Sequence, residues 1–160
     1  MNVIKRLRIG CEEKAIALLD WIGSRSGKPV LPAHLLTGTR GEDAALFYLR
    51  RKGYVVVARR WSPGDEPGDI DLIAWQGPIL CFVEVKTRTA HDMTPAEAAV
   101  DDHKRTMLRR LARRYVQQLP QVAWPAVRFD VIGVYLLRAK PPEFVHFESA
   151  FDMREQSEQR

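Results

Sequence analysis

The sequence predicts an α/β fold in which a mixed central sheet is flanked by helices. One helix-like segment precedes three strand-like segments, and a second helix-like segment precedes a further strand. The strand-like segments alternate in polarity with a period of two, whereas the helix-like segments carry apolar residues three and four positions apart. This order of elements predicts one domain built around a single sheet.

The first helix of the folded domain is predicted to start at Thr39 and to end before Gly53. Thr39 and Glu42 form the Ser/Thr-x-x-Glu pattern in which two side chains cap a helix N-terminus. The apolar residues Ala45 and Leu49 lie on one helix face. Glu42 therefore has two interpretations, because it can close the cap or point toward the core side and contribute to a site.

Turns rich in Gly and Pro separate the predicted strands. Strands are predicted at residues 54–60, 69–75, 79–86, 127–137 and 142–147. The first three form an antiparallel meander, and the last is an edge strand. A long helix lies within residues 95–118, where both Thr94-Pro-Ala-Glu97 and Asp101-Asp102 are possible starts.

Length and composition describe one ordinary domain with an apolar core. The chain has 160 residues, of which 46% are hydrophobic and 28% charged, so it needs no disulfide or structural metal to fold. No apolar run approaches the roughly 20 residues of a membrane-spanning helix. The two cysteines form no Cys-x-x-Cys pair. We therefore expect a cytoplasmic protein with no membrane partner.

The chain is predicted to have three parts. Residues 1–36 form a basic helical appendage with a linker, residues 37–152 form the folded domain, and residues 153–160 form a polar tail. The formal net charge of +5 favours an anionic partner.

Acidic residues and a lysine occupy neighbouring predicted strands. Side chains alternate between faces along a strand, so Asp69 shares a face with Asp71, and Glu84 shares one with Lys86. A tight turn joins the two strands, which can place Asp71 beside Glu84 and Lys86. Carboxylates among apolar residues need compensation, and Mg²⁺ supplies it while keeping water and substrate phosphate as further ligands. A neighbouring lysine can then orient or deprotonate the attacking water.

Alternatives remain for each of these residues. Asp69 follows Pro67-Gly68 and fits a turn residue, whereas Asp71 lies one pleat deeper and is the better ligand candidate. Glu84 and Lys86 also fit a surface ion pair at a strand end. Their apolar flanks argue against that interpretation.

The order of these residues resembles the active-site pattern of the PD-(D/E)XK, or restriction-endonuclease-like, nuclease superfamily. Within that superfamily the chain is similar to the bacterial YraN-like family over about residues 37–152. The segments that carry the resemblance are Thr37-Gly-Thr-Arg-Gly-Glu42, Gly68-Asp-Ile-Asp-Leu-Ile73, Phe82-Val-Glu-Val-Lys-Thr-Arg88 and Arg128-Phe-Asp-Val-Ile132.

The resemblance implies a restriction-endonuclease-like fold and a nuclease site. It makes Asp71 and Glu84 metal-binding carboxylates for Mg²⁺ or Mn²⁺, and it makes Lys86 the catalytic lysine. Glu42 matches the helical acid that related junction-resolving nucleases bring to the site, as a further catalytic and metal-binding residue. The backbone carbonyl of Val85 would complete the ligand shell. The implied reaction is hydrolysis of phosphodiester bonds in DNA or RNA.

The long helix carries a basic surface with no acidic residue within it. A solvated face usually mixes signs and an all-basic ridge repels itself, so phosphate binding is favoured over simple solvation. Lys104 also lies near the apolar stripe, within reach of the site. The predicted nucleic-acid-binding residues are Lys104, Arg105, Arg109, Arg110, Arg113, Arg114 and Arg88.

The sequence thus predicts a metal-dependent nuclease directed by substrate structure rather than sequence, with DNA favoured over RNA. A nucleic-acid-binding module of the same fold that does not cleave is the alternative. A third possibility is an interaction protein that presents its basic surfaces to acidic proteins. The acidic set favours the enzyme, because binding alone does not need carboxylates that repel phosphate.

Three other residues have no predicted catalytic or metal-binding role. Asp130 lies between apolar residues of a predicted strand, and we expect hydrogen bonds to bury it. His146 has no metal-ligand spacing, and no role is predicted for it. Trp61 follows two arginines and fits either core packing or base stacking.

Overall fold

A computed structural model of the chain describes residues 33–90, 100–120 and 125–154. The elements are helix α2 (Ala33–Arg51), strands β1 (Val55–Trp61), β2 (Ile70–Gln76) and β3 (Ile79–Arg88), helix α3 (Asp102–Gln117), and strands β4 (Ala126–Tyr135) and β5 (Glu143–Phe151). The predicted order is confirmed, and most strand ends lie within two residues of their predicted positions. Neither described helix has the length and apolar composition needed to cross a membrane.

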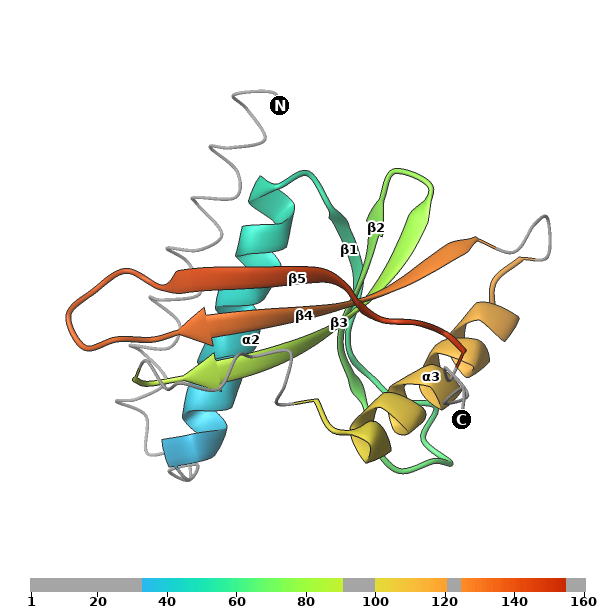
Figure 1. Ribbon diagram of the computed structural model, residues 1–160, viewed down its shortest axis with the longest axis horizontal. Helices are drawn as coiled ribbons and strands as arrows, with labels where there is room; N and C mark the ends of the chain where they lie inside the picture. The colour runs from blue at the N-terminus through green and yellow to red at the C-terminus, as the bar shows by residue number, and fades with distance from the viewer. Residues whose placement is uncertain (1–32, 91–99, 121–124, 155–160) are drawn as a thin grey trace, which may run out of the picture.

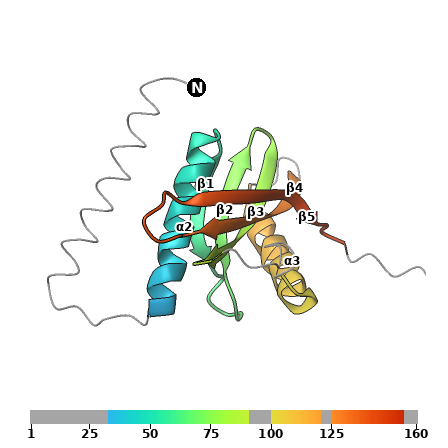
Figure 2. The same ribbon diagram turned by 60° about the vertical axis from the view of Figure 1, so that its left-hand side comes forward.

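The strands form one mixed sheet in the order β1-β2-β3-β4-β5. Strands β1, β2 and β3 make the predicted antiparallel meander, β3 and β4 run parallel, and β5 pairs antiparallel with β4. Parallel neighbours need a crossover connection, and α3 lies within it. Helices α2 and α3 lie on opposite sides of the sheet (Figures 1 and 2). This arrangement agrees with the predicted α/β, restriction-endonuclease-like fold.

Each face of the sheet has its own apolar cluster. Leu49 of α2 packs with Val83 on one face, and Leu111 of α3 packs with Phe82 on the other. Adjacent residues of β3 therefore point to opposite faces, as the predicted alternation requires. Glu84 lies one pleat beyond Phe82 and shares the α3 side.

Helix α2 begins at Ala33, six residues before the predicted start at Thr39. Thr39 therefore lies inside the helix, and its hydroxyl donates a hydrogen bond to the Leu35 carbonyl at 3.0 Å. The capping-box interpretation of Thr39 and Glu42 is wrong, because the backbone at Thr39 is already helical. The predicted domain boundary at residue 37 falls within this helix. Three predicted segments lie outside the described residues: the appendage before residue 33, the tail beyond residue 154, and the alternative helix start at residues 94–97.

Gly41 lets helix α2 approach strand β3 closely. A Cβ atom at this position would lie 1.9 Å from Oγ1 of Thr87. We expect Gly41→Ala to lower the free energy of unfolding by about 1–3 kcal/mol, the usual cost of overpacking, as measured by urea denaturation. Gly38→Ala is the matched control, because no atom lies within 4 Å of its added Cβ. It should gain about 0.5–1 kcal/mol from helix propensity, and equal effects of the two substitutions would contradict the close approach.

Both edge strands contain breaks in pairing register. In β1 the extra residue is Val57. In β5 extra residues fall between Phe147 and Phe151, and Ser149 in this bulge adopts a φ of 56°. Trp61, at the end of β1, packs edge-on against Tyr115 with ring centroids 5.1 Å apart, so core packing accounts for it.

Candidate active site

Four predicted site residues line one cleft of about 650 Å³. Helix α2 contributes Glu42, strand β2 contributes Asp71, and strand β3 contributes Glu84 and Lys86. This is the concave arrangement expected from acids and a lysine on neighbouring strands. Arg88 also lines the cleft.

Where β2 and β3 separate, the side chain of Asp71 accepts a hydrogen bond from a backbone amide, as a carbonyl of a paired strand would. The regular pairing of the two strands ends at Leu72 and Val83. Beyond this pair, Oδ2 of Asp71 accepts a hydrogen bond at 2.7 Å from the amide of Val85, which lies two residues past Val83. Burial, followed by the charge of Glu84, raises the pKa of Asp71 to about 7. The carboxylates of Asp71 and Glu84 thus repel each other in a poorly solvated environment. A cation bound between such carboxylates stabilises their ionised forms.

Glu84 is a buried carboxylate between two ammonium groups. Its side chain is 4% exposed. Nζ of Lys86 lies 3.0 Å from Oε1, and Nζ of Lys104 lies 3.0 Å from Oε2. Burial lowers the pKa of Lys104, but the negative charge of Glu84 outweighs it, so the pKa of Lys104 is raised overall. Lys104 therefore reaches Glu84, as its position near the apolar stripe of the helix predicts.

The start of helix α3 brings Lys104 to Glu84. The helix begins at Asp102, and the Asp101 side chain accepts a hydrogen bond from the Lys104 amide at 2.8 Å. Val100, just before this cap, is 1% exposed and anchors the turn in the core. The Asp101-Asp102 start is therefore the one seen in the described residues.

Glu42 lines the cleft but is paired with Arg60 of β1. Nε of Arg60 lies 2.6 Å from Oε2, and Nη2 lies 2.9 Å from Oε1. Arg60 adopts a φ of 44°, a left-handed conformation that costs a non-glycine residue about 1–2 kcal/mol. Sequence reasoning missed this pair, because only the packing of α2 on β1 brings the two residues together.

The cleft supplies oxygen ligands for a hard cation, but not a complete protein ligand set. Among the residues that the structure describes, no three His, Cys, Asp or Glu side chains are arranged to hold a metal ion. Asp71 and Glu84 fit Mg²⁺ or Mn²⁺ as a pair, because such ions are commonly held by one or two carboxylates together with water and substrate phosphate. The metal-binding roles of Asp71, Glu84 and Glu42 stay predictions.

The basic surface of α3 is paired within the chain. The ion pairs are Arg110 with Glu66, Arg114 with Asp65, and Arg105 with Asp102. The hydrogen bonds to backbone carbonyls are from Arg109 to Asp152 and from Arg113 to Met153. Apart from Asp102, these partners lie outside the helix, so the sequence of the helix surface alone does not show them. Arg110 and Arg114 nevertheless stay about half exposed.

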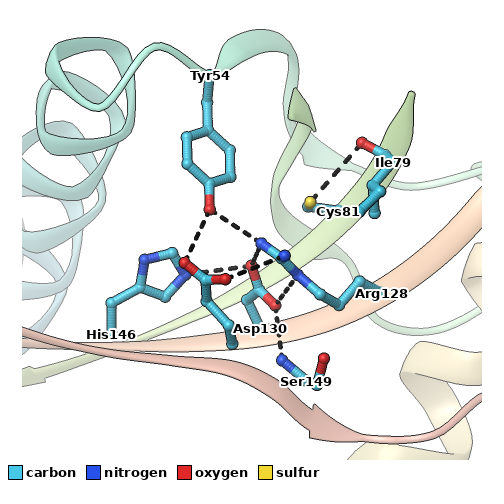
Figure 3. Close-up of polar contacts among 8 residues, drawn as sticks. Tyr54, Ile79, Cys81, Arg128, Asp130, His146 and Ser149 are labelled. Carbon is cyan, nitrogen blue, oxygen red and sulfur yellow. Dashed lines mark hydrogen bonds and ion pairs between the residues drawn. The ribbon is translucent and has the colours of Figure 1, made fainter. Parts of the chain in front are cut away.

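Asp130 lies outside the cleft, in a buried network that joins β4 to β5 (Figure 3). Its carboxylate accepts two hydrogen bonds from Arg128, both 2.8 Å, and one from the Ser149 amide at 3.0 Å. Nε2 of His146 lies 3.1 Å from the same carboxylate. Burial opposes ionisation, but the hydrogen bonds from His146 and Arg128 outweigh it and lower the pKa of Asp130. The structural interpretation of Asp130 agrees with this geometry.

One known protein family matches a part of the chain that includes the four acidic and lysine residues of the cleft. The model described as "Uncharacterised protein family UPF0102" matches residues 41–134, which include Glu42, Asp71, Glu84 and Lys86. The chain belongs to the UPF0102 family. The YraN-like resemblance is thereby confirmed at the level of the family.

Several UPF0102 proteins are similar along most of their length. One from Koribacter versatilis (strain Ellin345) is 49% identical over 137 residues, which cover 86% of this chain and 92% of the relative. One from Solibacter usitatus (strain Ellin6076) is 50% identical over 104 residues, which cover 65% of this chain and 77% of the relative. One from Rhodococcus opacus (strain B4) is 38% identical over 119 residues, which cover 74% of this chain and 98% of the relative.

Proposed function

We propose that this UPF0102 protein is a divalent-metal-dependent nuclease of the PD-(D/E)XK type that hydrolyses phosphodiester bonds in DNA or RNA. One observation carries the proposal: the cleft joins the partly buried carboxylate of Asp71 and the buried carboxylate of Glu84 with the ammonium group of Lys86. Buried like charges favour a cation, and a lysine beside them suits a phosphate substrate. This combination of charges contributes little to the free energy of unfolding, so a purely structural role does not explain it.

The two strand carboxylates are the proposed ligands of Mg²⁺ or Mn²⁺. Asp71 and Glu84 supply hard oxygen atoms, and Glu42 is a further carboxylate at the same cleft. When bound, such an ion polarises a phosphoryl oxygen and lowers the pKa of a coordinated water. The hydrogen bond from the Val85 amide keeps the Asp71 carboxylate in place during this reaction.

Lys86 is the residue proposed to act on the attacking water. Its ammonium group is held 3.0 Å from Glu84 and faces the same cleft. An ammonium group in this position donates hydrogen bonds that orient the water, and it stabilises the negative charge that develops on the phosphate. Arg88, at the end of β3, adds positive charge along the same wall.

The direct test is a cleavage assay on a panel of branched, single-stranded and duplex DNA and RNA, with Mg²⁺, with Mn²⁺ and with EDTA. The proposal expects cleavage of at least one substrate that depends on the divalent ion. DNA is the favoured substrate, and a preference for a structure rather than a sequence is expected. Binding without cleavage under every condition would support the alternative, a non-cleaving module of the same fold.

The arginines of α3 are proposed to contact the nucleic-acid backbone without reading its sequence. Neighbouring side chains three and four positions apart lie about 5–6 Å from one another, and phosphate can compete with their internal partners. We expect duplexes of different sequence to bind alike, with log affinity falling linearly as log salt concentration rises. Replacing Arg109, Arg110 and Arg113 with Gln should reduce that slope by about 0.7–0.9 for each phosphate that is no longer neutralised. An unchanged slope would reject this surface.

A further inference from the structure

Two lysines from separate elements neutralise one carboxylate of the cleft. Lys86 comes from the same strand as Glu84, whereas Lys104 comes from the first turn of α3. Each ammonium group lies 3.0 Å from a different oxygen of Glu84. Both carboxylate oxygens are therefore occupied by positive charge in the protein alone.

The same oxygens are the ones a divalent cation would need. An ion held by Asp71 and Glu84 adds two positive charges close to both ammonium groups, so the original pairing cannot persist unchanged. Lys86 already faces the cleft, where the proposed reaction uses it. Lys104 lies on the α3 side of Glu84, and its flexible four-carbon stem lets the ammonium group move while the helix stays in place.

We propose that Lys104 is an exchangeable counter-ion: it neutralises Glu84 in the free protein and binds a substrate phosphate when a divalent cation and nucleic acid occupy the cleft. This inference rests on the proposed nuclease function. It assigns Lys104 a substrate-binding role distinct from the role of Lys86. It also means that the free protein stores a phosphate ligand on its own metal site.

A permanent structural ion pair makes the opposite predictions. If Lys104 only holds Glu84 in position, its loss disturbs the carboxylate and weakens cation binding. If Lys104 competes with the cation, its loss strengthens cation binding and weakens nucleic-acid binding. The two readouts therefore move in opposite directions only for an exchangeable counter-ion.

The test compares Lys104→Met with wild type in two measurements on the full chain. Mn²⁺ affinity is measured by calorimetry without nucleic acid, and we expect the dissociation constant to fall by about threefold or more because a competing charge is gone. Binding of a single-stranded DNA oligonucleotide is measured by fluorescence anisotropy with Ca²⁺, another cation that takes oxygen ligands, and intact strands are verified on a gel. Here we expect the dissociation constant to rise about tenfold, as for the removal of one charged hydrogen bond.

Two further variants make the result specific. Lys140→Met removes the same charge from the exposed turn between β4 and β5, and it should change neither dissociation constant by more than about twofold. Lys104→Gln keeps a hydrogen-bond donor for Glu84 without the charge, and it should shift both constants in the same directions as Lys104→Met. This variant keeps the test valid if the methionine substitution unfolds the protein.

The outcomes separate the two proposals. A wild-type protein that binds no Mn²⁺ and cleaves no substrate of the panel would overturn both the nuclease function and the exchange by Lys104. A wild-type protein that binds Mn²⁺, combined with unchanged or weaker Mn²⁺ binding in both Lys104 variants, would overturn the exchange alone. Unchanged DNA binding in both variants would likewise reject Lys104 as a phosphate ligand.

Discussion

Asp71→Asn and Glu84→Gln will each slow divalent-dependent cleavage by at least about a hundredfold, the scale of removing one electrostatic interaction with a transition state. Each substitution replaces a carboxylate with an amide of nearly the same size, so the side-chain volume is kept and a charge that the cation needs is lost. At position 71 the amide oxygen can still accept the hydrogen bond from the Val85 amide. The measurement is the initial rate on a substrate of the panel that wild type cleaves.

Thermal melting in EDTA distinguishes a chemical defect from a structural one. Asp71→Asn should melt at a higher temperature than wild type, because it removes one of two like charges that oppose each other in a poorly solvated part of the folded protein. Asp152→Asn is the matched control, since this exposed residue lies outside the cleft and uses only its backbone carbonyl in the hydrogen bond from Arg109. Wild-type rates in both cleft variants would show that the cleavage activity has another source.

Asp130→Asn should lower the free energy of unfolding by about 3–5 kcal/mol, the usual effect of breaking a buried ion pair. The substitution leaves the mostly buried Arg128 guanidinium with Glu148 as its remaining carboxylate partner, at 3.1 Å and on the surface. It also weakens the interactions with His146 and with the Ser149 amide. Urea denaturation at neutral pH measures the destabilisation, and Asp152→Asn should stay within about 0.5 kcal/mol of wild type.

The pH dependence gives the same prediction an independent check. The pKa of Asp130 is lower in the folded protein than its ordinary value, so ionised Asp130 stabilises the fold above the unfolded-state pKa of about 3.9. That contribution is lost as the pH falls through the folded-state pKa. The stability difference between wild type and Asp130→Asn should therefore shrink as the pH falls into the acid range. A difference that stays the same down to about pH 2, below the ordinary carboxyl range, would contradict the ionised network.

The parts of the fold that depend on local periodicity could be predicted from the sequence. Alternation along β3 placed Phe82 and Glu84 on one face and Val83 on the other, and the structure separates Phe82 and Val83 into different apolar layers. The tight turn before Ile79 predicted the antiparallel pairing of β2 with β3. Since Asp71 and Glu84 lie on these two strands, their convergence at one cleft followed from the same local signals.

The pairings that sequence reasoning missed depend on tertiary packing. The Thr39 to Glu42 pattern has the same form inside a helix as at its start, so the sequence did not reveal that α2 begins at Ala33. The pairing of Glu42 with Arg60, and of Arg110 with Glu66, joins residues that only the assembled layers bring together. Pairings of this kind have no local periodicity from which to predict them.

The register breaks in β1 and β5 affect how the molecule meets other chains. An outer strand with regular spacing presents unpaired amides and carbonyls that can template the addition of a foreign strand, whereas a bulge bends the strand and interrupts that template. The extra residue Val57 interrupts one edge of the sheet formed by the described residues, and the bulge around Ser149 interrupts the other. Because the Ser149 amide is bonded to the buried Asp130 carboxylate, that bulge is held by the interior of the protein. The network that stabilises the fold thus also protects it against edge-to-edge aggregation.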